Sequence, residues 1–185
     1  MPSHRLPRLP GPTAPPARRP EAPADLEKFN AAPADDARRA LLTCCRSPRW
    51  AHRVADHRPY PDLDSLLAAA DEAAYDLTPG DLTEALARES LAPLPAGAHS
   101  AAHTALSAAH AAYQSRFGHM FVICLDDVAP DEAADRVLDA IRSRLTNDPD
   151  DERPLAAEEL RRLARGRLTR LICDPSGLAV AESVR

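Results

Sequence analysis

Signals that start or stop an α-helix recur along this chain and constrain its fold more than any other feature. Ser47-Pro48 offers an N-cap followed by proline at the first helical position. Thr78-Pro79-Gly80-Asp81 repeats this pattern and adds a carboxylate in the first turn, where the helix dipole favours negative charge. Gly118 follows another helical pattern as a left-handed C-cap. We therefore expect several helices with well-defined ends.

Apolar residues at helical spacing lie between these signals. They make up 44% of the 185 residues but aromatic residues only 4%, so alanine, leucine and valine must form the core. The last three helices are expected at Ser100–Phe117, Asp131–Leu145 and Asp151–Ile172. Between the first two of them lies the apolar run Met120–Leu125, which we expect to be buried and either extended or one irregular turn. We predict an all-α fold, a single-domain bundle of about seven helices.

Composition excludes several classes of protein. No run of about 18 apolar residues exists, and the start of the chain lacks the apolar stretch of a secretory signal, so we expect a cytoplasmic protein that does not span a membrane. A formal net charge of −5 argues against a nucleic-acid-binding protein. The four cysteines lack paired metal-ligand spacing. We expect them to be buried thiols, with no metal bound.

Proline content marks the boundaries of the domain. Residues 1–24 hold eight prolines and almost no periodic apolar residues, which predicts a disordered tail. We assign the helical domain to residues 25–173 and a flexible C-terminal tail to residues 174–185. The sequence leaves open whether the subunit forms a homodimer.

Four segments carry a resemblance to a known family: Phe29–Tyr60, Leu77–Ala87, Ala111–Cys124 (AAYQSRFGHMFVIC) and Arg144–Leu168. Together they resemble the 2-oxo-4-hydroxy-4-carboxy-5-ureidoimidazoline (OHCU) decarboxylase family, which is all-α and acts in uric-acid degradation. The resemblance implies a lyase that decarboxylates a small ureidoimidazoline carboxylate to (S)-allantoin. It implies no metal or organic cofactor.

Two of the four elements of the family's site have counterparts in this chain. The resemblance implies that an F-G-x-x-F-V-I segment binds a substrate carbonyl through free backbone amides, and that an arginine on the last helix binds the substrate carboxylate. Arg167 matches that arginine. The residues that match the segment are Phe117, Gly118, Phe121, Val122 and Ile123.

The other two elements are altered. Glu89 stands where the family has its proton-handling histidine, and Ser90 where a proline follows it. In the family's Ser-x-x-Glu-Gln motif, Ser100 matches the serine and His103 takes the place of the glutamate. One hypothesis is that the acid/base pair has exchanged positions, so that His103, Glu89 and Arg167 are catalytic while Ser90 and Ser100 bind substrate. The rival hypothesis is a degenerate site that binds a ligand or partner without turnover.

Overall fold

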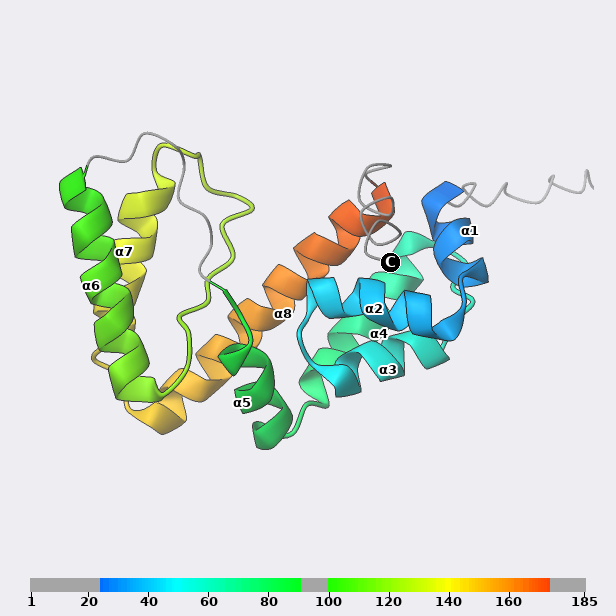
Figure 1. The fold of residues 1–185 in the computed structure, drawn as a ribbon, viewed down its shortest axis with the longest axis horizontal. Coiled ribbons are helices and arrows are strands. Elements are labelled where there is room, and N and C mark those ends of the chain that lie inside the picture. The colour runs from blue at the N-terminus through cyan, green and yellow to red at the C-terminus, as the bar shows by residue number, and fades with distance from the viewer. Residues whose placement is uncertain (1–23, 91–99, 174–185) are drawn as a thin grey trace, which may run out of the picture.

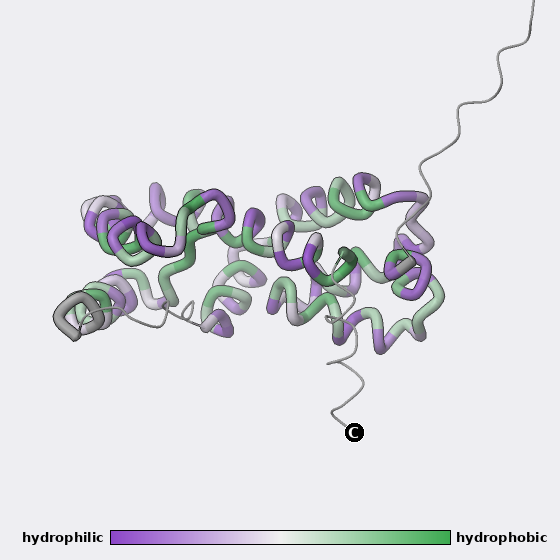
Figure 2. Tube along the Cα trace, turned by 90° about the horizontal axis from the view of Figure 1, so that it is seen from above, coloured by the Kyte–Doolittle hydropathy of each residue, from purple (hydrophilic) through white to green (hydrophobic). Residues whose placement is uncertain are grey.

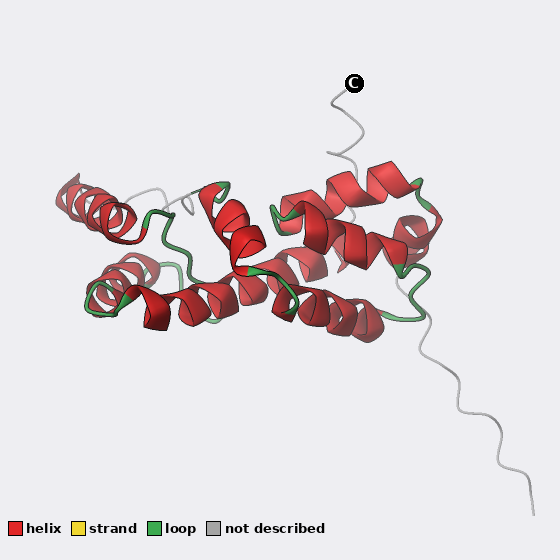
Figure 3. Ribbon diagram, turned by 90° about the horizontal axis from the view of Figure 1, so that it is seen from below, coloured by secondary structure: helices red, strands yellow, loops and turns green. Residues whose placement is uncertain are grey.

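The computed structural model describes residues 24–90 and 100–173, and all regular structure in these ranges is α-helical. The predicted all-α class is confirmed, and Figure 3 shows helices joined by loops without a strand in the part described. The predicted tails lie outside the described residues, except for Ala24. The helices are α1 (Ala24–Ala31), α2 (Ala34–Cys44), α3 (Pro48–Asp56), α4 (Leu63–Tyr75), α5 (Pro79–Ala87), α6 (Ser100–Phe117), α7 (Ala133–Arg144) and α8 (Pro149–Cys173).

The helix starts follow the capping signals of the sequence. Ser47 Oγ accepts a hydrogen bond from the Trp50 amide at 3.3 Å at the start of α3. At the start of α5, the Asp81 amide donates to Thr78 Oγ1 at 3.2 Å and the Thr78 amide donates to Asp81 Oδ2 at 3.0 Å. This reciprocal pair satisfies two amides that the first helical turn leaves without partners.

The long helix α8 runs through the elongated molecule and organises it (Figure 1). Helices α1–α4 gather at one end, α6 and α7 pair at the other, and α5 lies beside the middle of α8. Figure 2 shows hydrophobic stretches on the helices of both ends. None of the described helices has the length and apolarity needed to cross a bilayer.

Two hydrophobic cores meet at the segment that follows α6. The larger core is built from α1–α5 and α8 and includes Val122, whereas the smaller core lies between α6 and α7 and includes Phe121. Side chains of an extended segment alternate in direction, so adjacent residues enter different cores. Met120–Leu125 was predicted to be buried and either extended or one irregular turn; its backbone is neither helix nor strand, and its Phe121 and Val122 side chains are buried.

Two cysteines at the end of α2 are buried thiols, as expected. Cys44 and Cys45 are each 1% exposed. Burial raises the pKa of Cys44 to about 11 and that of Cys45 to about 12, from an ordinary value of 9.0. The same expectation is wrong for Cys173, which is exposed near the end of α8 beyond the packed face of the helix.

Gly118 ends α6 with a φ of 78°, and its amide donates to the Gln114 carbonyl at 2.8 Å. A Cβ there would meet no atom within 4 Å, so Gly118→Ala tests backbone strain alone. We expect it to lower the free energy of unfolding by about 1–2 kcal/mol, measured by urea denaturation. Gly80→Ala, inside α5, is the matched control and should change it by no more than about 1 kcal/mol, in the stabilising direction. Equal effects of the two substitutions would contradict this account of the α6 terminus.

The buried thiols make stability depend on pH. Because their folded pKa values lie above the unfolded value, folding retains protons that the unfolded chain releases, so stability is lost as pH rises above about 9. Other cysteines and the tyrosines also titrate above about pH 9, so the contribution of a buried thiol is measured as the difference between the wild type and a variant that lacks it. We expect the free energy of unfolding to fall by about 1 kcal/mol for each thiol between about pH 9 and pH 10, because the unfolded thiol is only half ionised at pH 9.

Urea unfolding of the wild type and of Cys45→Ala across this range measures the effect. The variant should show the shallower decline, because it lacks one of the two thiols. A free energy of unfolding that does not change with pH in either protein would rule out the explanation.

Candidate functional site

A buried ion pair joins the end of α5 to α8. Glu89 lies just after α5, where its amide donates to the Leu86 carbonyl at 3.3 Å, and its side chain is 1% exposed. Arg167 Nη1 donates to Glu89 Oε1 at 2.9 Å, and Nη2 donates to Oε2 at 3.0 Å. Burial alone would lower the pKa of Arg167, but the hydrogen bonds and charge of Glu89 outweigh it and raise that pKa. The contact is a bidentate, charge-assisted pair.

Arg167 also contacts the end of a third helix. Its Nη1 donates to the Cys44 carbonyl at 3.1 Å, in the last turn of α2. Helix C-termini carry partial negative charge and carbonyls without partners in the helix. Glu89 adds a full negative charge where α2 and α5 both end. The positive charge of Arg167 therefore offsets the negative charge of one carboxylate and the partial negative charges at two helix C-termini.

One edge of the Arg167 guanidinium stays open. Glu89 binds the edge formed by Nη1 and Nη2, whereas Nε has no hydrogen-bond partner among the described residues. The Arg167 side chain is 28% exposed, whereas that of Glu89 is 1% exposed. With Nη2, Nε of Arg167 offers a second pair of donors to a ligand oxygen.

The extended segment after Gly118 includes backbone amides that have no hydrogen-bond partner among the described residues. Within the described residues, the amides of Phe121, Val122 and Ile123 make no hydrogen bond, while the Cys124 amide donates to Glu159 Oε2 at 2.7 Å. A non-helical amide that the protein leaves unpaired is available to a ligand carbonyl. That these amides bind a substrate carbonyl, as the resemblance implies, stays a prediction.

A buried polar network holds the same segment from its carbonyl side. Arg144 Nη1 donates to the Val122 carbonyl at 2.7 Å, and Arg144 Nε donates to Glu152 Oε1 at 2.7 Å. The Tyr113 hydroxyl also donates to Glu152. Burial, reinforced by Glu152, raises the pKa of Tyr113. The Arg144 guanidinium carbon lies 4.5 Å from the centre of the Phe121 ring, a cation–π contact.

Sequence reasoning assigned no role to Arg144 or Glu152. The signal that was available is the segment Arg144–Leu168, which resembles the family and begins at this arginine. Glu152 is 1% exposed, so its charge is stabilised by the hydrogen bonds of this network rather than by water.

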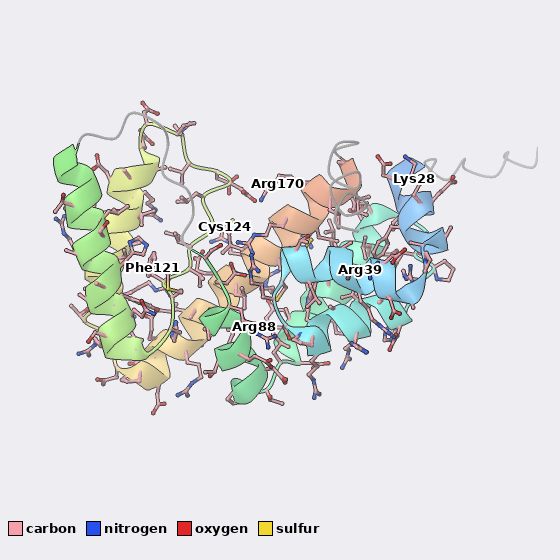
Figure 4. All side chains as sticks on the ribbon, in the orientation of Figure 1. Lys28, Arg39, Arg88, Phe121, Cys124 and Arg170 are labelled. Carbon is pink, nitrogen blue, oxygen red and sulfur yellow. The ribbon has the colours of Figure 1, made fainter. Side chains whose placement is uncertain are left out.

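Close packing on α8 brings the segment to the helix that carries Arg167 of the ion pair. Asp126 lies so near Gly166 that a Cβ on this glycine would come 2.1 Å from Asp126 Oδ2. Arg170 Nη1 donates to the other oxygen of Asp126 at 3.0 Å. Figure 4 shows Cys124 on the side of α8 and Phe121 toward α6. The segment thus packs against α8 where its Cys124 amide binds Glu159, and the chain beyond the segment reaches Gly166, the residue before Arg167.

The remaining predicted site residues fall into two groups. Ser90 is exposed beside Glu89, and Phe117 is partly buried with its ring 4.7 Å from that of Tyr113. Ser100 and His103 belong to the first turns of α6, but their side chains lie outside the described residues. The exchanged acid/base pair of Glu89 and His103 therefore stays a prediction.

A cavity of about 220 Å³ lies elsewhere, between α4, α5 and α8. None of the predicted site residues lines it. Arg161 at its wall is bound to Asp71 at 2.6 Å and to Glu158, so this arginine has no spare charge for a ligand. Among the residues described, no His, Cys, Asp and Glu side chains are grouped as a metal site requires.

Comparison with known proteins shows which family the chain resembles. A family model described as OHCU decarboxylase matches residues 30–90 and 90–169. The crystal structure of (S)-allantoin synthase is 17% identical with a TM-score of 0.64, over 80% of this chain and 53% of that one, so this chain spans about half of the synthase. The crystal structure of OHCU decarboxylase in the presence of (S)-allantoin is 21% identical with a TM-score of 0.64, over 77% of this chain and 100% of that one.

Comparison with the curated proteins found no match. The two solved structures establish the likeness of fold, and the family model covers most of the helical region. The chain belongs to the OHCU decarboxylase family.

Proposed function

We propose that this protein is a cofactor-free carboxy-lyase that decarboxylates the ureidoimidazoline carboxylate OHCU to (S)-allantoin. The observation that supports this most is the guanidinium of Arg167, which is fixed by Glu89 on one edge and open on the other. A segment with unpaired amides packs against the same helix, α8. A carboxylate and a carbonyl of one small ring are the groups that such donors bind.

Each group has a role in this proposal. The Nε and Nη2 edge of Arg167 holds the substrate carboxylate, and the amides of Phe121 to Ile123 hold a ring carbonyl. The bond between the hydroxyl-bearing ring carbon and the carboxylate breaks, carbon dioxide leaves, and the electron pair forms a double bond to the adjacent ureido-bearing carbon, whose imine nitrogen takes up a proton. A proton then adds to one face of the ureido-bearing carbon, which fixes the configuration of the product, while the hydroxyl loses its proton and becomes a carbonyl.

The proton donor is His103 in this proposal. Both oxygens of Glu89 already accept hydrogen bonds from Arg167, so neither carries a proton toward a ligand while the pair is intact. Cys44 and Cys45 are no substitutes, because raised pKa values keep both thiols protonated near neutral pH.

The second candidate function is a ligand-binding module without turnover. It is favoured by Glu89 itself, which replaces the family's histidine and fills one edge of the guanidinium that the family uses for substrate. The same fold and the same donors would then bind a ureide without protonating it.

The configuration of the product separates the two functions. Spontaneous breakdown of OHCU gives racemic allantoin, whereas an enzyme that protonates one face gives a single enantiomer. We expect the wild type, supplied with freshly generated OHCU, to yield an excess of (S)-allantoin by circular dichroism or chiral chromatography. We expect His103→Ala to lower the rate of its formation at least about 100-fold, the usual contribution of a general acid.

His52→Ala is the matched control, because His52 is exposed on α3 away from the ion pair; it should leave the rate unchanged. Racemic product from folded wild type would reject the decarboxylase and support the binding module. A full rate with His103→Ala would reject the proposed proton donor.

A further inference from the structure

Glu89 neutralises the positive charge that Arg167 alone would present to a ligand. Arg167 carries one positive charge, and Glu89 neutralises it through two hydrogen bonds of 2.9 and 3.0 Å. The carboxylate of Glu89 is 1% exposed, so water screens it little. Any ligand group on the open edge of Arg167 is therefore exposed to both charges.

The open edge itself does not require a charged ligand. Nε and Nη2 donate in parallel, and a neutral carbonyl or ureide oxygen accepts such bonds as a carboxylate does. A carboxylate adds attraction to the guanidinium but also repulsion from Glu89, which lies on the adjacent edge of the same group. The usual advantage of a carboxylate at an arginine is largely cancelled.

The helix ends and the neighbouring arginines of α8 add no net positive charge at this place. The ends of α2 and α5 both direct partial negative charge toward it, as the Cys44 carbonyl on Arg167 shows. The nearby Arg170 is bound to Asp126 at 3.0 Å, and Arg162 lies 3.5 Å from Glu159. These two arginines are thus each matched by a carboxylate.

We propose that Glu89 is a specificity-determining residue, which makes this site bind an uncharged ureide ring at least as tightly as the same ring bearing a carboxylate. The inference rests on the proposed function in that Arg167 contacts the ligand. It also disfavours the bound carboxylate relative to the bound product, since loss of carbon dioxide removes the group that Glu89 repels. Glu89 acts through Arg167 and on the charge of the ligand, without transferring a proton.

Two matched probes test the inference by calorimetry: hydantoin-5-acetate, which is anionic, and hydantoin-5-acetamide, which is neutral and of the same shape. We expect the wild type to bind the acetamide at least as tightly as the acetate. Glu89→Gln keeps the size of the side chain and removes its charge, so it should tighten acetate binding at least about tenfold. It should change acetamide binding by less than about threefold.

Glu84→Gln is the matched control. It removes the same charge from an exposed residue of α5 that pairs with Arg88 at 2.7 Å, and it should change neither affinity more than about twofold. Tighter binding of the acetate by wild type would overturn the inference, even if Glu89→Gln did not fold. So would an equal effect of Glu89→Gln on both probes, or no binding of either probe.

The outcome is separable from that of the turnover experiment. Racemic allantoin together with the predicted order of affinities would reject the decarboxylase and retain the charge preference. An excess of (S)-allantoin together with tighter acetate binding would retain the enzyme and reject Glu89 as the residue that sets the charge preference.

Discussion

The ion pair between Glu89 and Arg167 is the interaction on which the arrangement of this site depends. It fixes the end of α5 against α8, and through the Cys44 carbonyl it also fixes the end of α2. A buried carboxylate at converging helix C-termini is unfavourable without a cation, so neither partner is tolerated alone. The pair thus aligns three helices and, at the same point, leaves one edge of a guanidinium open to a ligand.

The extended segment supplies the second half of the site by a different use of hydrogen bonds. Its carbonyl side is held by Arg144, whose charge is matched by the buried Glu152. Its side chains are anchored in two cores, Phe121 in one and Val122 in the other. Held in these ways, the backbone keeps a fixed position while its amides have no partner in the described part of the protein. Fixed and unpaired donors are what electrostatic catalysis requires.

Most helices could be predicted because their signals are local. Ser47, Thr78 and Gly118 act on residues within one turn, so their effects can be inferred from sequence spacing alone. Helix α1 was missed because it has no such signal; its Leu26 and Phe29 are buried against the rest of the domain, an interaction between distant parts of the chain. The eight described helices thus exceed the expected number of about seven by this one.

Residues of the candidate site could be predicted from the sequence in two cases: where a residue is unfavourable at its local position in a helix, or where it matches the family. A glutamate at the end of α5 is unfavourable by itself, which pointed to Glu89, but its pairing with Arg167 spans 78 positions and could not be derived from spacing. The same holds for Tyr113 and Glu152, which are 39 positions apart. The approach of the Asp126 carboxylate to Gly166 likewise joins distant parts of the chain and has no local signal.

A double-mutant cycle on unfolding tests the central claim most directly. Urea denaturation of the wild type, Glu89→Gln, Arg167→Gln and the double variant yields the coupling free energy between the two side chains. A buried bidentate pair predicts a coupling of at least about 2 kcal/mol, with the double variant more stable than the sum of the single losses implies. A coupling below about 0.5 kcal/mol, the level of an exposed pair, would contradict the account.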